Sequence, residues 1–246
     1  MNRRGKAAAL LLVVFGGVGA ATARVAAQDQ PVCPAEVAGA ERLVLVLGSG
    51  LDARAATVRF MERRGERWHA SGEPKAAALG VGGMAWSWAA KAYAPGGERV
   101  KIEGDKRTPA GFFRLGKPFG FSARNVPAYV GLRPGQHYCV DDLHSPLYNT
   151  VVAKASAGEA SGEDMAAIAL YRQGLFVDYP TNREAKGGSC IFVHVRRSAK
   201  AGTVGCVALA ERDVTAMQDW AREKPTVIGI LHSAAWDRLR GCFPGL

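Results

Sequence analysis

Beyond its first residues the chain has no apolar run long enough to cross a bilayer, which takes about 20 residues. It also has no internal repeat, which excludes repeat architectures. Its basic residues outnumber the acidic ones, 32 against 22, but form no stripe interleaved with aromatic residues, as nucleic-acid binders have. We therefore expect a globular monomer with no nucleic-acid partner and no membrane span once the leader is removed.

The single apolar run, residues 7–21, follows three basic residues and precedes small ones, the pattern of a signal peptide. Cleavage after Ala23 or Ala27 satisfies the small-residue rule, and we favour Ala27 because a polar segment follows it. An uncleaved anchor is the alternative, although the run is short for a span. Cleavage after Ala27 leaves 219 residues, enough for one domain, and lowers the formal charge from +10 to +6. The expected location is the periplasm or cell envelope.

The chain has five cysteines, and all of them lie in the part expected to be exported: Cys33, Cys139, Cys190, Cys206 and Cys242. Export permits disulfides, but an odd number leaves one thiol over. If Cys206 is that thiol, the other four can pair in three ways. Cys33 with Cys242 is attractive because it ties the chain ends together, and Cys139 with Cys190 would then remain.

Short β-prone segments with turns between them dominate the chain after residue 42 and predict a mainly β fold, a sandwich or a barrel. The expected strands are 43–47, 56–61, a segment from Trp68, 99–102, 111–115, 175–179, 191–195 and 226–231. Helical spacing predicts helices over 85–93 and 210–223. Residues 153–162 are rich in Ala, Ser and Gly and are expected to form a loop.

The segment 190–206 carries the clearest chemical signal. An apolar, strand-like run includes His194, a polar loop follows, and the turn Thr203-Val204-Gly205 ends in Cys206. A cysteine is a good nucleophile only as the thiolate. A nearby imidazolium and backbone N–H groups would lower the thiol pKa by about two units for ~2.7 kcal/mol. We expect His194 to be the base of a partly exposed Cys206 nucleophile.

Each of these residues has a simpler interpretation. Cys206 could be half of a structural disulfide, and His194 a strand histidine with its hydrogen bonds satisfied. Cys190, His194 and Cys206 could bind zinc, but a fourth ligand is missing and the spacing fits no common zinc module. We expect no metal and no cofactor.

A second segment, residues 104–113, reads Gly-Asp-Lys-Arg-Thr-Pro-Ala-Gly-Phe-Phe. Together with residues 139–149, His194 and the Thr-Val-Gly-Cys turn, it resembles the YkuD-like L,D-transpeptidase catalytic domain, a family that cross-links bacterial peptidoglycan. The twelve residues from His194 to Cys206 are a short interval and indicate a divergent branch. The resemblance implies an N-terminal segment over 28–42 and a catalytic domain over 43–246.

The resemblance also implies roles for individual residues. Cys206 would be acylated, His194 would be oriented by a backbone carbonyl, and N–H groups near Gly205 and Cys206 would bind the oxyanion. Val204 stands where the family often has a histidine. The Arg that often follows the Cys is absent, so Arg196, Arg197 or Arg212 is expected to bind the substrate carboxylate.

Four further residues are candidates for substrate binding. Thr203 lies in the nucleophile turn. Asp178 and Tyr179 follow an apolar strand, where they either line the site or cap a turn. Arg107 either contacts substrate or forms an ion pair with Asp105 that holds its loop.

The expected function is that of an exported cysteine acyltransferase acting on peptidoglycan stem peptides, and so contributing to cell-wall synthesis and cell shape. A peptidoglycan L,D-carboxypeptidase or endopeptidase would use the same thioester with water as acceptor. A non-catalytic wall-binding module is the third possibility, with Cys206 in a disulfide.

Overall fold

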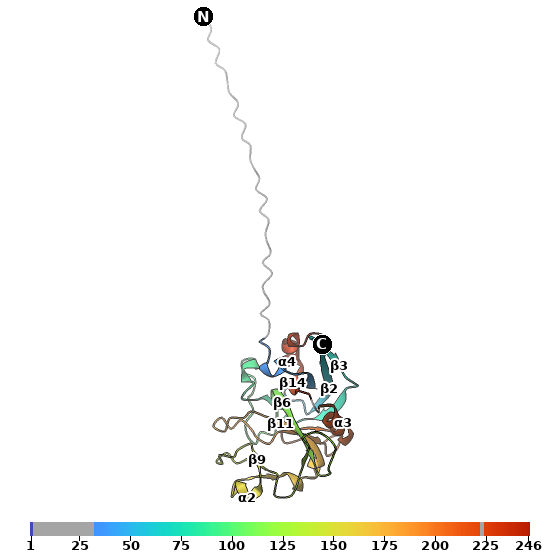
Figure 1. The fold of residues 1–246 in the computed structure, drawn as a ribbon. Coiled ribbons are helices and arrows are strands. Elements are labelled where there is room, and N and C mark those ends of the chain that lie inside the picture. The colour runs from blue at the N-terminus through green and yellow to red at the C-terminus, as the bar shows by residue number, and fades with distance from the viewer. Residues whose placement is uncertain (2–31, 222–223) are drawn as a thin grey trace. The chain divides into compact units, whose positions relative to one another are not determined.

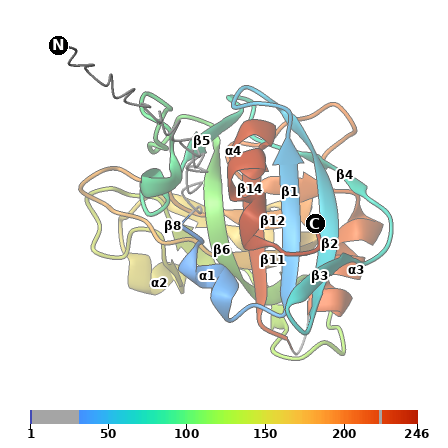
Figure 2. The same cartoon turned by 90° about the horizontal axis from the view of Figure 1, so that it is seen from above.

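Eight strands close into a barrel in the computed structural model, which describes residues 1, 32–221 and 224–246. Around the ring they follow the order β1, β14, β6, β11, β12, β13, β4, β2, and β2 pairs with β1 to close it. Figure 1 shows the strands from one side, and Figure 2 shows β6, β14, β1 and β2 next to one another. Their bounds are β1 Arg42–Gly48, β2 Ala55–Arg64, β4 Lys75–Ala78, β6 Thr108–Gly120, β11 Gln173–Asp178, β12 Phe192–Val195, β13 Val207–Leu209 and β14 Thr226–His232. The pairs β1–β14 and β12–β13 are parallel, and the other pairs in the ring are antiparallel. A mainly β, barrel-like fold is confirmed, and the sandwich alternative is not.

Smaller strands extend this ring. Strand β3 (Arg67–Ala70) pairs with β2, while β5 (Met84–Trp86) and β7 (Val130–Gly131) pair with β6. A separate sheet has the order β10 (Gly162–Asp164), β8 (Tyr138–Val140), β9 (Val151–Val152). All but Met1 of the predicted signal peptide, and residues 28–31, lie outside the described residues. The described residues from Val32 onward belong to one compact unit.

The helices are few and short. They are α1 (Ala35–Ala38), α2 (Lys154–Ala157), α3 (Glu211–Ala221) and α4 (Ser233–Leu239), with 3₁₀ turns η1 (Lys91–Tyr93), η2 (Met165–Ala167), η3 (Ala169–Arg172) and η4 (Arg240–Cys242). Within the described ranges, no helix combines the length and the apolar character that a membrane crossing requires.

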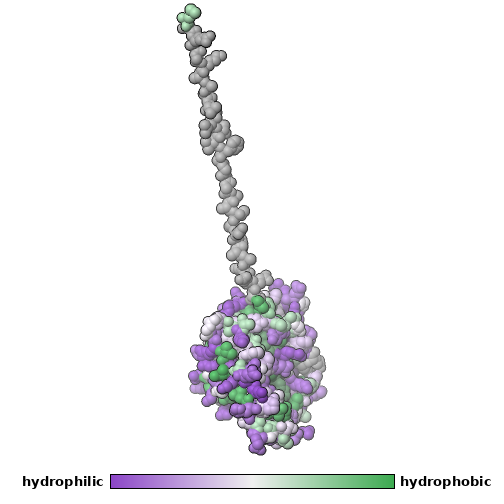
Figure 3. Space-filling view, turned by 90° about the vertical axis from the view of Figure 1, so that its left-hand side faces the viewer, coloured by the Kyte–Doolittle hydropathy of each residue, from purple (hydrophilic) through white to green (hydrophobic). Residues whose placement is uncertain are grey.

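Alternation along the strands builds two cores. In β1, Val44 and Val46 join the interior cluster of the barrel, while Leu43 and Leu45 join an outer cluster with α4. Because both faces of this strand are buried, its sequence is apolar without interruption. Val214 and Met217 of α3 belong to the interior cluster, so the amphipathic face of this helix covers the barrel interior. The face of the unit seen in Figure 3 is mostly hydrophilic, with scattered hydrophobic residues.

Two disulfides are present, Cys33–Cys242 and Cys139–Cys190, and Cys206 is the free cysteine among the described residues. Both expected pairings are therefore confirmed. The half-cystine interpretation of Cys206 is wrong because its candidate partners are bonded to each other. The zinc interpretation is also wrong, because Cys190 has no thiolate to offer.

Several local predictions need correction. The expected helix over 85–93 is wrong: Met84–Trp86 pairs with β6, and only the last three residues form a 3₁₀ turn. Residues 99–102 form no strand, and only Val100 makes a bridge, to Trp86. The expected loop over 153–162 contains helix α2. The predicted helix over 210–223 is confirmed as α3 across its described residues.

Candidate active site

Strands β12 and β13 bring His194 and Cys206 together. They pair in parallel, with Val193 opposite Val207 and His194 opposite Ala208. Val193 and Val207 point into the barrel interior, so by alternation His194 and Cys206 share the outer face. Both side chains line one cavity of about 440 Å³. The sequence motif thus correctly predicts their juxtaposition.

The turn before Cys206 is held by two threonines. Thr203 Oγ1 donates to the Cys206 carbonyl over 2.6 Å and accepts the Gly205 N–H over 3.1 Å, and Thr108 Oγ1 donates to the same carbonyl over 3.3 Å. Gly205 has φ +151°, and a Cβ there would lie 3.3 Å from Ile191 Cδ1 and 3.4 Å from the Arg107 carbonyl oxygen. Glycine is therefore required by conformation.

These contacts change two of the predicted roles. Thr203 lines the cavity, but its hydroxyl is committed to the turn. The Gly205 N–H, expected to bind the oxyanion, donates to the Thr203 hydroxyl instead. The Cys206 N–H has no hydrogen-bond partner among the described residues and is left as the available donor.

The Cys206 thiol is buried, with 4% of the residue exposed. It donates to the Cys190 carbonyl over 3.4 Å and accepts the Phe192 N–H over 3.4 Å. Burial, and secondarily the charge of Glu163, raises the pKa of Cys206 to about 12. The expectation of a partly exposed thiol with a lowered pKa is therefore wrong.

The imidazole of His194 is held in one orientation. Its Nδ1 lies 2.9 Å from the Val195 carbonyl, which can only accept, so Nδ1 carries the proton and Nε2 has the free lone pair. Burial lowers the pKa of His194. Cys206 and His194 thus rest as a neutral thiol and a neutral base, an arrangement suited to proton transfer during attack.

Two residues of the candidate site escaped the sequence analysis. Tyr171, from η3, packs its ring against His194 at a centroid distance of 5.3 Å and belongs to the same buried cluster as Cys206. Its hydroxyl donates to Glu163 Oε1 of β10 over 2.7 Å. Both line the cavity with the thiol. Neither has a fixed sequence spacing to Cys206, and only the packing of the second sheet brings them there.

A second cavity of about 230 Å³ shares Cys206, Glu163 and Tyr171 with the first. Polar side chains enter it from three loops: Glu103, Lys106, Asp141 and Ser189. The first cavity is more apolar, with Val81, Ile168, Leu170 and Val204 in its wall. Val204, 73% exposed, lines both. Cys206 therefore borders two chemically different cavities.

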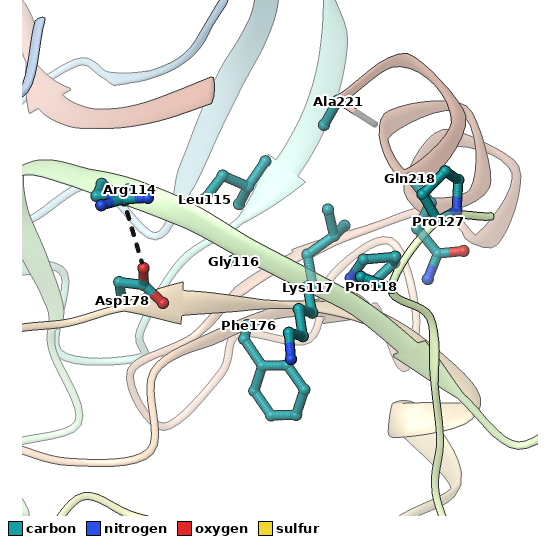
Figure 4. Close-up of a pocket in the computed structure, with 12 residues that line it drawn as sticks. Arg114, Leu115, Gly116, Lys117, Pro118, Pro127, Phe176, Asp178, Gln218 and Ala221 are labelled. Atoms are coloured by element: carbon teal, nitrogen blue, oxygen red, sulfur yellow. Dashed lines mark ion pairs between the residues drawn. The ribbon is translucent and has the colours of Figure 1, made fainter. Parts of the chain in front are cut away.

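Asp178 and Tyr179 lie elsewhere. Asp178 pairs with Arg114 over 3.9 Å and lines a separate cavity of about 520 Å³ (Figure 4). Tyr179 is buried, and its hydroxyl donates to the Gly187 carbonyl over 2.5 Å. Neither lines a cavity at Cys206, so the structure does not bring these two residues to the candidate site.

The arginines predicted to bind substrate differ in whether they line a cavity at Cys206. Arg107 donates to the Gly82 carbonyl and lies 3.7 Å from Asp52, away from both cavities. Its expected ion pair with Asp105 is absent, because Asp105 pairs with Lys101 over 2.6 Å.

Of the three arginines considered for the substrate carboxylate, Arg197 alone lines a cavity with Cys206. The assignment of this role to Arg196 is not supported, since that residue is absent from both walls. The side chain of Arg212 is 89% exposed on α3.

No protein-family model matches the chain, and no curated protein matches it. Among solved structures, the helical cell shape determining protein Pgp2 from Campylobacter jejuni matches with 15% identity and a TM-score of 0.43, over 78% of this chain and 47% of that one. A point mutant of the same protein matches with 14% identity and a TM-score of 0.43, over 83% and 53%. Bd1075 of Bdellovibrio bacteriovorus matches with 18% identity and a TM-score of 0.41, over 82% and 54%. The chain spans about half the length of these structures.

Proposed function

We propose that this protein is an exported cysteine acyltransferase, an L,D-transpeptidase acting on peptidoglycan stem peptides in the periplasm or cell envelope. The observation that carries the proposal is the pairing of one free thiol, Cys206, with one neutral imidazole, His194, on one face of adjacent strands and in one cavity. The motif resemblance supplies the substrate class, and the two disulfides suit an oxidising compartment.

Acylation begins when Cys206 Sγ attacks the carbonyl carbon of a stem peptide bond and the thiol proton passes to Nε2 of His194. The Cys206 N–H donates to the oxyanion that develops. When the C–N bond breaks, His194 returns the proton to the leaving amine, and a thioester remains. An acceptor amine then attacks the thioester, again losing its proton to His194, and releases the thiol.

Arg197 is proposed to bind a carboxylate of the stem peptide in the more apolar cavity. A guanidinium there can form two parallel hydrogen bonds to a carboxylate. Replacement of Arg197 by Ala should raise KM with a smaller effect on kcat, because the contact is distant from the reacting bond. Arg196→Ala, next in sequence but outside both cavities, is the matched control and should leave KM unchanged.

The second cavity supports transfer over hydrolysis. It gives an acceptor its own approach to Cys206, and the carboxylates of Glu103 and Asp141 suit an acceptor that arrives as a cation. A hydrolase would need space only for water at this position.

Incubation of the purified protein with defined tetrapeptide stems, followed by mass spectrometry of the muropeptide products, tests the proposal. Cross-linked dimers that form with wild type and not with Cys206→Ala or His194→Gln are the expected result. Shortened stems without dimers would identify a hydrolase instead. If wild type leaves the stems unchanged, the enzymatic proposal is wrong and a wall-binding role replaces it.

A further inference from the structure

Tyr171 contacts both members of the proposed catalytic pair. Its ring meets the imidazole of His194 edge to face, at 62° and 5.3 Å. It also belongs to the same buried cluster as Cys206 and lines both cavities with it, and its hydroxyl acts, against burial, to lower the pKa of the Cys206 thiol. The remaining partner of this hydroxyl is Glu163, over 2.7 Å.

A phenolic hydroxyl has one proton to donate. In this site two acceptors compete for it, the Glu163 carboxylate and the sulfur of Cys206. We propose that Glu163 is a positioning residue for the nucleophile and acts through Tyr171, by setting which of the two receives the hydroxyl proton.

Two arrangements follow from the protonation of Glu163. As a carboxylate, Glu163 accepts from Tyr171, so the phenol turns its lone pairs toward the sulfur and the thiolate has only the Phe192 N–H as a donor. As a carboxylic acid, Glu163 donates to the phenol oxygen, and the Tyr171 proton turns toward the sulfur. The second arrangement stabilises the thiolate character that develops as the proton leaves for His194.

The surroundings make the protonated form of Glu163 accessible. Burial, opposed by the Tyr171 hydrogen bond and reinforced by the charge of Asp141, raises the pKa of Glu163. The other charged or titratable groups that face this space are Glu103 and Lys106 in the polar cavity and Arg197 and His194 in the apolar one. The charge of Lys101 acts to lower the pKa of the Cys206 thiol and is the smallest of the causes that act on it.

The effect of Glu163 and Tyr171 on turnover rests on the proposed function. The reactivity of the Cys206 thiol can be tested without it. The rate at which iodoacetamide alkylates Cys206 is measured from pH 6 to pH 10 in wild type, Glu163→Gln, Tyr171→Phe and the double variant. Alkylation forms the S–C bond with loss of iodide and needs no peptidoglycan substrate, so a failure of the muropeptide assay leaves this result interpretable.

Glutamine carries no charge and can donate to the phenol oxygen, so it imitates the protonated acid. Glu163→Gln is expected to alkylate about tenfold faster than wild type at a given pH, a shift of about one pH unit in the profile. Tyr171→Phe keeps the ring packing and should slow alkylation severalfold. In the double variant the gain from glutamine should vanish, because the hydroxyl that transmits it is gone.

Glu211→Gln is the matched control. Glu211 pairs with Arg172, the neighbour of Tyr171, over 2.8 Å, but lines neither cavity. Its profile should overlay that of wild type. The inference is overturned if Glu163→Gln also overlays wild type, or if the tenfold gain persists in the Tyr171→Phe background, which would indicate a direct charge effect. Circular dichroism of each variant establishes that the fold is intact, and Tyr171→Phe alone tests the donor role if Glu163→Gln does not fold.

Discussion

The resting state of Cys206 gives the sharpest prediction. Burial raises the pKa of its thiol from 9.0 to about 12, three units, which corresponds to about 4 kcal/mol against forming the thiolate. Between pH 7 and pH 9, the folded protein should therefore react with iodoacetamide about a thousandfold more slowly than the same cysteine in the unfolded chain. The rate should rise about tenfold per pH unit without a plateau until near pH 12.

The alkylation rate also depends on the charge of His194. Because burial lowers the pKa of its imidazole, His194 places no positive charge beside the thiol near neutral pH. His194→Gln should therefore leave the slope of the alkylation profile unchanged while it abolishes acylation by a stem peptide, which needs the base. The two assays together separate a general base from a preformed thiolate–imidazolium pair.

Stability supplies an independent measurement. The native protein retains the Cys206 proton between pH 9 and about pH 12, where the unfolded chain loses it. This group's contribution to stability is thus fully present below pH 9 and is lost as the pH rises across that window. Cys206→Ala should lack this part of the pH dependence. A plateau in alkylation below pH 8, or a rate equal to that of the unfolded chain, would refute the neutral-pair description.

Four further outcomes are expected. Cys206→Ala should abolish turnover and lower the free energy of unfolding by only about 1 kcal/mol, measured by urea denaturation, because one buried sulfur is lost. Gly205→Ala should lower the thermal midpoint and impair acylation at a cost of about 1–3 kcal/mol, since φ +151° disfavours a side chain; equal activity of the two proteins would contradict the role of the turn. Replacing Cys33 and Cys242 together by serine should lower the free energy of unfolding by up to about 5 kcal/mol, because the bond closes a sequence separation of 209 residues; an unchanged midpoint would show that other contacts hold the ends. A carbapenem should acylate the protein once, as a thioester, and intact mass with peptide mapping should place the adduct on Cys206; an adduct that remains in Cys206→Ala would exclude this site.

The sequence predicts best those contacts that follow from the pairing of neighbouring strands. His194 lies near the end of β12 and Cys206 directly precedes β13, so the pairing of these two neighbouring strands is enough to bring them together. The free thiol follows similarly once the other four cysteines pair.

Asp178 illustrates where this reasoning fails. Strand β11 runs antiparallel to β12 with Gly174 opposite His194, so Asp178 is four residues further along and roughly 13 Å away. A position directly after a strand does not say which neighbour that strand faces, nor in which direction it runs. The register shift between Leu175 and Val177 is likewise invisible in the residue pattern.

Glu163 and Tyr171 could not be predicted for a different reason. They belong to a second sheet and to a 3₁₀ turn, and their meeting with Cys206 depends on how that sheet packs over the outer face of the barrel. Contacts of this kind are long-range and carry no local periodicity. The hydrogen bond from the Gly205 N–H to the Thr203 hydroxyl is local, but the residue pattern alone does not show which N–H groups of the turn stay free.

The sulfur atoms around the site have a consequence for how the protein matures. Cys139 and Cys206 share one buried cluster, and Cys190 packs against it. An oxidant acting before the chain has folded can join either Cys139 or Cys190 to Cys206, and each such product would be an inactive isomer that needs thiol exchange to recover. Among the three bonds that Cys139, Cys190 and Cys206 can form with one another, only Cys139–Cys190 leaves the Cys206 thiol free, and it is the bond present in the structure, where the Cys190 carbonyl accepts the thiol hydrogen bond. The proposed activity therefore depends on oxidative folding in which Cys139 and Cys190 pair before either reacts with Cys206. Protein produced in a reducing cytosol should gain activity when it is refolded in a glutathione redox buffer.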